Sequence, residues 1–429
     1  MIKSFSCSRY RNITINDMEF NRINVFIGPN NAGKTNLINA VSFLASILQQ
    51  NIFEEGSTAF YKQLEQKGWS RMLQQGADKR NIVLEWIIEL APDTPLFRYN
   101  LGFYIGESEI DRRNFFITSE SLSYKEKNST NALNPYNFFN CHNQNPNEGV
   151  FSYYSDDNNI KKNKRVSLSV RNNETVLLQV DELIKQSKEF YEKYSNVKFK
   201  EGIENLVDYE RRFFSYSSAR FDLDTLRKDA RNIGEHRRIN ISGTNLINVL
   251  QYWKYANVNI FKKYCDMIKP LFGVGNNLDI DLIPIPSSDL LISNIIVGNK
   301  VYRLSDLSDG TLKAMILAMI LIDQNDQASV IAIDEPELNL HPAWQQIFCA
   351  WLLNSKNSRQ YFISTHSPEI LDELTSGFVN GDISIFALSL QGTGFQRITK
   401  ENVQEYLENE WNLGDLYRAK AIEIGGWPW

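Results

Sequence analysis

Eight consecutive residues, Gly28 to Thr35, have the types and the spacing of a loop that binds phosphate groups. They read Gly-Pro-Asn-Asn-Ala-Gly-Lys-Thr and match the pattern GxxxxGK[ST] at every defined position. The glycines let backbone N–H groups face phosphate oxygens at the positive end of the following helix. Lys34 would contact the β- and γ-phosphates, and Thr35 would offer a hydroxyl to Mg²⁺. We therefore expect ATP and Mg²⁺ as cofactors, bound by Gly28, Asn30, Asn31, Ala32, Gly33, Lys34, Thr35 and Asn36.

Two adjacent carboxylates, Asp334 and Glu335, follow the apolar run Ser329 to Ile333, which reads as a strand. Asp334 is placed to hold Mg²⁺, and Glu335 to orient or activate an attacking water. The alternative is that this pair only caps the next helix. Because the same chain carries a phosphate loop, we favour the first interpretation.

Two further segments could complete such a site. The turn Leu307-Ser308-Asp309-Gly310 lies shortly before the Asp334 strand and precedes the apolar run Ala314 to Ile322, which predicts a buried helix. A third predicted strand begins at Tyr361 and ends in the polar turn that contains His366.

Strands and a helix must position the phosphate loop. Ile23 to Ile27 is a short apolar run that predicts a buried strand leading into Gly28, and residues 81–90 and 97–105 predict a further pair of strands. One apolar helix face is predicted by the spacing of Leu37, Val41, Leu44 and Leu48.

The middle of the chain, residues 106–235, reads as an insertion. Its first part is crowded with asparagine and has little apolar periodicity, which predicts loop or partial disorder. A basic cluster and a charged helical stretch over roughly 177–212 follow. That stretch is too short and too poor in heptads for a long coiled coil.

Composition narrows the class of protein. The chain has 429 residues, is 42% hydrophobic and carries a net charge of -5, which argues against a uniformly basic nucleic-acid binder. No apolar run approaches the ~20 residues that span a bilayer, and no signal peptide is recognisable. Four scattered cysteines suit a reducing compartment, and only Cys141-His142 hints at a metal. We expect a cytoplasmic, soluble protein.

Together these motifs resemble the ABC/SMC-like branch of AAA-annotated ATPases, typified by the OLD and RecF-like families. The resemblance covers residues ~1–105 and ~240–390 and is carried by Met1-Ile2-Lys3, Gly28 to Thr35, Leu307 to Gly310, Asp334-Glu335-Pro336-Glu337, His341-Pro342 and Ser364 to Pro368. It implies an α/β fold, an ABC-type ATPase head with a mixed sheet around the phosphate loop. Residues 1–105 and 236–429 would form the two parts of that head.

The resemblance also implies a homodimer that closes around two ATP molecules. Ser308 and Gly310 would face the γ-phosphate held by the partner chain, and His366 would contact the γ-phosphate as a switch, acting with the catalytic Lys34 and Glu335. Residues 336–342 would cross the interface, although a plain helix-entry turn explains them equally well. Gln74 or Gln75 is the candidate for the glutamine that reports on the γ-phosphate and Mg²⁺.

Nuclease activity is not expected, because the residues after His366 leave no room for the TOPRIM domain of OLD nucleases. The resemblance points instead to stand-alone ATPases of anti-phage systems of the Septu and PARIS type, which regulate a separate effector, a nuclease or toxin. The alternative is a RecF-like clamp that binds DNA across the dimer. Its nucleic-acid contacts would come from Lys161, Lys162, Lys164, Arg165, Arg227, Arg231, Arg237 and Arg238. The terminal Trp427-Pro428-Trp429 is expected to pack onto the ATPase or into a partner.

Overall fold

The computed structural model divides into two compact units. It describes residues 1–50, 58–107, 114–125, 136–143, 149–154, 165–228, 230–231, 236–273, 277–286, 288–322, 328–355, 359–388 and 395–421. The first unit comprises Met1–Arg22, Asn30–Phe214 and Leu388–Gln396, and the second comprises Ile23–Pro29, Ser215–Ala387 and Arg397–Trp429. The phosphate loop is thus where the chain passes from the second unit into the first.

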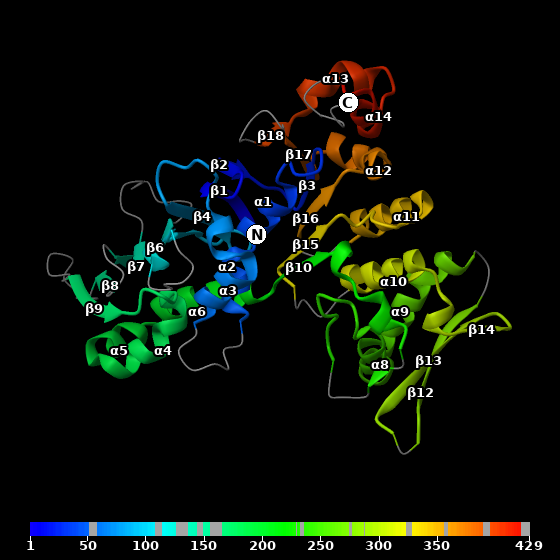
Figure 1. Cartoon of the computed structure of the whole chain (residues 1–429), viewed down its shortest axis with the longest axis horizontal. Helices are drawn as coiled ribbons and strands as arrows, with labels where there is room; N and C mark the ends of the chain where they lie inside the picture. Colours follow the sequence, from blue (N-terminus) through cyan, green and yellow to red (C-terminus); the bar gives the residue numbers. More distant parts are fainter. Residues whose placement is uncertain are drawn as a thin grey trace. The chain divides into compact units, whose positions relative to one another are not determined.

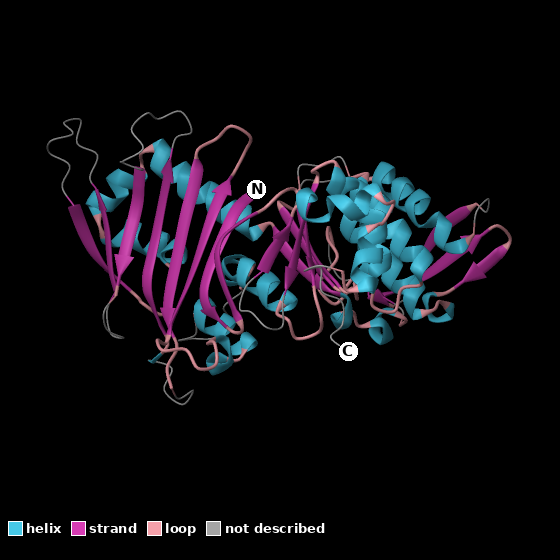
Figure 2. Ribbon diagram, turned by 90° about the horizontal axis from the view of Figure 1, so that it is seen from above, coloured by secondary structure: helices cyan, strands magenta, loops and turns pink. Residues whose placement is uncertain are grey.

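An eight-stranded sheet forms the first unit, and every neighbouring pair in it is antiparallel. Figure 2 shows its strands side by side. In spatial order they are β2 (Ile13–Glu19), β1 (Ile2–Tyr10), β4 (Asn81–Glu89), β5 (Leu96–Tyr104), β6 (Phe116–Lys125), β7 (Tyr136–His142), β8 (Gly149–Tyr154) and β9 (Arg165–Val170). Residues 81–90 and 97–105 therefore form the predicted strand pair.

Helices cover the apolar face of this sheet. They are α1 (Lys34–Val41), α2 (Phe43–Leu48), α3 (Ala59–Lys67), α4 (Val176–Gln186), α5 (Lys188–Tyr194) and α6 (Val197–Arg211). Trp86 of β4 is buried and donates its indole N–H to the Val41 carbonyl at 2.8 Å. Phe43 stacks on Phe103 with ring centroids 5.2 Å apart. A Cβ at Gly202 would lie 2.2 Å from Phe138, so glycine allows α6 to approach β7 closely.

Two expectations for local structure need correction. The helix predicted over Leu37 to Leu48 is two helices, α1 and α2, separated at Ser42, and the charged stretch after residue 176 is three helices. The asparagine-rich segment is not simply loop, because β7 runs through it. Phe138, Phe139 and Cys141 are buried there, so aromatic packing outweighs the low strand propensity of asparagine.

Asn143 shows how one of these asparagines is used. Its buried side chain donates to the Ile117 carbonyl at 2.6 Å and accepts from the Val150 N–H at 3.0 Å, which links β6 to β8. Asn128, Asn131, Asn134, Asn145 and Asn147 lie outside the described residues.

A six-stranded sheet is the centre of the second unit (Figure 1). Its order is β10 (Phe213–Ser217), β15 (Val330–Asp334), β16 (Gln360–Thr365), β3 (Ile23–Ile27), β17 (Ile383–Leu388) and β18 (Phe395–Ile398). The pairs β15–β16, β16–β3 and β3–β17 are parallel. The expected α/β fold class is therefore confirmed, with the strand that leads into the phosphate loop inside a parallel array.

The remaining elements of the second unit are helices and a small antiparallel sheet. The helices are α7 (Leu223–Leu226), α8 (Leu246–Ala256), α9 (Val258–Ile268), α10 (Asp309–Ile322), α11 (Pro342–Leu353), α12 (Pro368–Val379), α13 (Lys400–Glu408) and α14 (Leu413–Ala419). The small sheet contains β11 (Ala230–Arg231), β12 (Leu278–Pro284), β13 (Leu290–Val297) and β14 (Lys300–Tyr302).

Helix α10 is buried around its whole circumference, from Gly310 to Ile322. It packs against α9 and α11, and Tyr264 of α9 donates to the Met315 carbonyl at 3.1 Å. The expectation of a buried helix after the Leu307–Gly310 turn is therefore confirmed. Among the described residues, no helix is long and apolar enough to cross a membrane.

Glu120 is expected to make the stability of the first unit depend on pH. It is 1% exposed and accepts from the Tyr99 hydroxyl and the Val176 N–H, both at 2.9 Å. Burial raises its pKa from 4.5 to about 7. Because the folded state keeps the proton longer than the unfolded state, the free energy of unfolding should fall by about 3 kcal/mol as pH rises between these values.

Urea unfolding of Glu120→Gln at pH 5 and pH 8 measures this effect. The variant should lose most of the pH-dependence that Glu120 contributes, while Glu174 and Glu210, whose pKa values burial also raises, keep the remainder. Glu201→Gln, on the exposed side of α6, is the matched control and should behave as the wild type. Equal pH slopes for Glu120→Gln and the wild type would refute the assignment.

Candidate nucleotide-binding site

Three parallel strands of the second unit end at one edge of the sheet. In the register of β15 and β16, Asp334 lies opposite Ser364, and in that of β16 and β3, Thr365 lies opposite Ile27. The carboxylates after β15, His366 after β16 and the start of the phosphate loop after β3 therefore come from adjacent strand ends. Ligand sites of parallel sheets are found at this edge.

The phosphate loop has the backbone that its glycines predict. Gly28 and Gly33 have φ values of 142° and 109°, and Asn31 has a φ of 63°. A Cβ at Gly33 would lie 2.9 Å from the Asn12 side-chain oxygen, so both conformation and space require glycine there. Lys34 is 5% exposed and begins α1.

Residues before the loop brace it within the first unit. Asn12 donates to the Asn31 carbonyl at 3.2 Å, and its side-chain oxygen accepts from the Asn36 amide at 2.7 Å. Arg11 donates to the Asn36 oxygen at 3.0 Å. Both polar atoms of the Asn36 side chain, which was expected at the nucleotide, are thus hydrogen-bonded to residues before the loop. Asn12 was not among the residues expected at this site from the sequence.

Asp334 and Glu335 have distinct environments. Asp334 is 8% exposed and accepts a hydrogen bond from the Ser364 hydroxyl. Glu335 has a φ of 52°, and its N–H donates to the Ser364 carbonyl at 3.0 Å. The left-handed backbone turns the chain sharply after β15, so that the Glu335 side chain is 27% exposed at the strand edge while Asp334 stays buried.

A buried carboxylate that sequence analysis left without a role, Glu337, holds His366. Its Oε1 accepts from the His366 backbone N–H at 2.7 Å and lies 3.1 Å from the ring Nδ1, although the latter pair is not aligned as a hydrogen bond. The Glu335 carboxylate is 3.8 Å from the same Nδ1. Burial raises the pKa of Glu337. Its position two residues after Glu335 was the only available sequence signal.

The Leu307–Gly310 turn begins α10 with a serine cap. The Ser308 hydroxyl accepts from the Thr311 N–H at 3.2 Å. A Cβ at Gly310 would lie 2.9 Å from the Asn339 carbonyl and 2.8 Å from Trp344. The buried Lys313 donates to the Leu338 carbonyl at 3.2 Å. This turn therefore packs directly on the segment that follows Asp334 and Glu335.

The segment 336–342 ends as a helix-entry turn. His341 is the N-cap of α11, its Nδ1 accepts from the Ala343 N–H at 3.2 Å, and Pro342 is the first helical residue. Asn339 has a φ of 63° and is exposed. Helix entry is thus observed for His341, while an interface role for Asn339 stays a prediction.

The two candidate glutamines differ in their contacts. Gln74 accepts from the Thr14 hydroxyl at 3.3 Å, and its backbone N–H donates to the Arg9 carbonyl at 3.0 Å. Gln75 is exposed. A role for either at a nucleotide stays a prediction.

Other candidate residues are dispersed. Arg237 lies over the Tyr252 ring at 5.8 Å, Arg238 donates to the Tyr216 hydroxyl at 3.1 Å, and Arg165 donates to Ser152. Lys161, Lys162, Lys164 and the Trp427–Trp429 tail lie outside the described residues. Cys141 is buried beside Asn143, and no group of three metal-binding side chains occurs in the described part of the chain.

The chain belongs to an AAA-domain family. The family model described as "AAA domain, putative AbiEii toxin, Type IV TA system" matches residues 23–372, most of the chain and all the motifs of the sheet edge. The resemblance to AAA-annotated ATPases is therefore confirmed.

Three relatives share part of this sequence. The chain is 35% identical over 89 residues to the Retron Vc95 probable ATPase of Vibrio cholerae serotype O1 biovar El Tor, covering 21% of this chain and 17% of that protein. It is 28% identical over 149 residues to the Septu protein PtuA of Bacillus mycoides (strain KBAB4), covering 33% and 19%. It is 29% identical over 110 residues to the Retron Ec83 probable ATPase of Escherichia coli, covering 24% and 20%. The aligned part is thus a fifth or less of each relative.

Alignments with two solved SMC heads cover nearly the whole chain at TM-scores below 0.5. The SmcHead bound to the C-winged helix domain of ScpA has a TM-score of 0.48 at 10% identity, covering 94% of this chain and 99% of that one. The SMC head domain from Thermotoga maritima has a TM-score of 0.41 at 12% identity, covering 93% and 98%.

Proposed function

We propose that this chain binds ATP with Mg²⁺, hydrolyses it, and dimerises around two ATP molecules to regulate a separate effector in anti-phage defence. The observation that carries the ATPase proposal is the shared strand edge, where Asp334, Glu335 and His366 lie beside the strand that enters the phosphate loop. The names of the retron and Septu relatives support the defence setting.

Asp334 and Thr35 are the residues proposed to hold Mg²⁺. A hard divalent cation prefers carboxylate and hydroxyl oxygens, which are the groups that these two side chains carry. The Ser364 hydroxyl fixes one Asp334 oxygen and so orients the carboxylate. Bound Mg²⁺ would neutralise charge on the phosphates, and Lys34 would add a second positive charge.

Glu335 is proposed to orient the attacking water. Its carboxylate is partly exposed at the strand end, 3.8 Å from the His366 ring, so the two side chains face the same region. Glu337 positions the His366 backbone by accepting the hydrogen bond from its N–H. His366 would then contact the γ-phosphate and report its presence.

The Leu307–Gly310 turn, called the signature turn below, supports the proposed homodimer through its exposed residues. Ser308 and Asp309 are exposed at the N-terminus of a long buried helix, whose first N–H groups attract anions. In the proposed dimer these groups meet the γ-phosphate held by the other copy. A RecF-like clamp is the alternative, but Arg237 and Arg238 already contact tyrosines within the chain, which favours the regulator.

Phosphate release by the purified chain with ATP and Mg²⁺ tests the activity, with Lys34→Ala as the decisive variant. Without the ammonium group, nucleotide affinity should fall at least about tenfold and turnover should be lost. Lys67→Ala, at the end of α3, is the control and should keep turnover. Undiminished hydrolysis by Lys34→Ala would refute the assignment of the phosphate loop.

A further inference from the structure

A pocket next to the signature turn is lined by basic and hydroxyl side chains, and none of its lining residues belongs to the phosphate loop. Its volume is about 350 Å³, within the lower range of small-molecule sites. The lining residues come from the end of α7, from β13 and from the turn (η6, Leu304–Asp306) before the signature: Arg227, Lys228, Ser293, Arg303, Leu304 and Ser305. The lining thus has three cations and no carboxylate.

Two of these cations are available to a ligand. Among the described residues, neither Lys228 nor Arg303 has a side-chain ion pair. Acidic groups lie close by without lining the pocket. Asp306 accepts from the Arg303 backbone N–H at 2.8 Å and from Ser305. Hydrogen bonds from Thr225 lower the pKa of Asp222, and the charge of Lys228 adds a smaller lowering.

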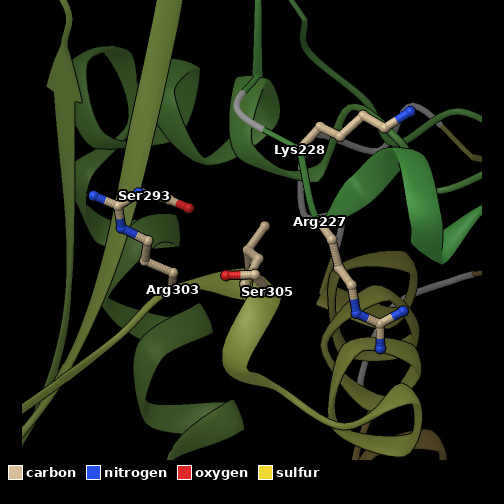
Figure 3. Close-up of a pocket in the computed structure, with 6 residues that line it drawn as sticks. Arg227, Lys228, Ser293, Arg303 and Ser305 are labelled. Carbon is tan, nitrogen blue, oxygen red and sulfur yellow. The ribbon is translucent and has the colours of Figure 1, made fainter.

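Arg227 connects the pocket to the signature turn. It donates to the Leu307 carbonyl at 3.3 Å and forms an ion pair with Asp309, while Asp224 is 3.7 Å away. Figure 3 shows its guanidinium turned toward α10, whereas the Arg303 side chain extends toward Ser293 and the Lys228 ammonium points away from Ser305. A ligand would therefore draw in Lys228, whose stem has several rotatable bonds.

We propose that this pocket binds a phosphate group, carried either by a small free phosphate compound or by a nucleic-acid backbone. Guanidinium groups match phosphate oxygens in pairs, and the Ser293 and Ser305 hydroxyls add neutral donors. Three cations without a lining carboxylate favour a multiply charged anion over a neutral ligand.

Occupancy of the pocket competes with Asp309 for Arg227. A phosphate beside the guanidinium weakens its bonds to Asp309 and Leu307, which hold the signature turn. This coupling, which rests on the proposed function, makes the pocket a regulatory site for closure around ATP. Binding itself does not depend on that function.

Pyrophosphate binding, measured by isothermal titration calorimetry in a Lys34→Ala background, tests the site separately from hydrolysis. Adding Lys228→Ala and Arg303→Ala together should weaken pyrophosphate binding at least about tenfold, since each substitution removes a charged hydrogen-bond donor from the pocket. Lys263→Ala with Lys300→Ala removes the same charge from residues outside the pocket and should change affinity less than about twofold. Equal affinity for the two double variants would overturn the proposal.

Folding and the source of the phosphate need two further measurements. Lys228→Arg with Arg303→Lys should retain binding, and thermal unfolding midpoints of the variants that match the parent chain would exclude misfolding.

A short fluorescein-labelled single-stranded DNA identifies the source of the phosphate group by fluorescence anisotropy. If a nucleic-acid backbone is the ligand, the DNA competes with pyrophosphate. The double variant Lys228→Ala, Arg303→Ala then lowers the slope of log DNA affinity against log salt concentration by about 1.4. If a free phosphate is the ligand, pyrophosphate binds and the DNA does not compete. If neither binds, the proposal is wrong.

Discussion

Glu335→Gln should leave ATP binding intact, reduce turnover by about 10²- to 10⁴-fold and trap an ATP-bound dimer. The amide has nearly the size of the carboxylate but cannot accept a proton from the attacking water. The left-handed backbone at residue 335 is held by its N–H bond to Ser364, which the substitution leaves in place. The lost step is therefore hydrolysis rather than binding.

Light scattering with saturating ATP and Mg²⁺ distinguishes the trapped dimer from the monomer. ADP, or Lys34→Ala in the same background, should restore the monomer because no γ-phosphate is then held at the interface. Glu373→Gln on α12, a carboxylate away from the sheet edge, is a control for the loss of one charge. A Glu335→Gln chain that stays monomeric with ATP would contradict the shared-site proposal.

Glu337→Ala is expected to cut turnover by about 10²-fold with a smaller change in ATP affinity. Glu337 accepts the His366 backbone N–H at 2.7 Å, and removing the carboxylate leaves that buried donor without its partner. His366 would then shift relative to Glu335, and displacements of about 1 Å in a catalytic arrangement have effects of this size.

Glu337→Gln separates positioning from charge. Its amide oxygen can still accept the His366 N–H, so turnover should recover most of what Glu337→Ala loses. Turnover measured against pH, together with the Michaelis constant for ATP, provides the readout that a purely structural role would not change. Glu337→Ala with wild-type turnover would show that His366 does not need this carboxylate.

The sequence alone predicted those features that depend only on residues close together in the chain. The Gly28–Thr35 loop requires glycines at fixed spacing, and Gly33 indeed has a backbone that other residues rarely adopt. The strands Ile23–Ile27 and Val330–Asp334 are buried throughout and are apolar except at Asn24 and Asp334, as expected for strands of a parallel sheet. Such patterns are local, so they can be read without coordinates.

Local patterns failed where packing overrode propensity. The asparagines of β7 suggested a loop, yet burial of Phe138 and Phe139 stabilises this segment as a strand of the sheet. The apolar spacing from Leu37 to Leu48 suggested one helix, but the helix is interrupted at Ser42. Periodicity reports which face is buried and does not report where a helix ends.

By itself the sequence indicated the AAA-type class and predicted the phosphate loop, the paired carboxylates and the signature turn, since each depends on residue types at short spacing. Only the tertiary structure brought Glu337 against His366, Gly310 against the Asn339 carbonyl and Arg227 against Asp309. Those pairs lie 29 to 82 residues apart in the chain. Strand register and helix packing decide them, and neither is encoded in any short segment of sequence.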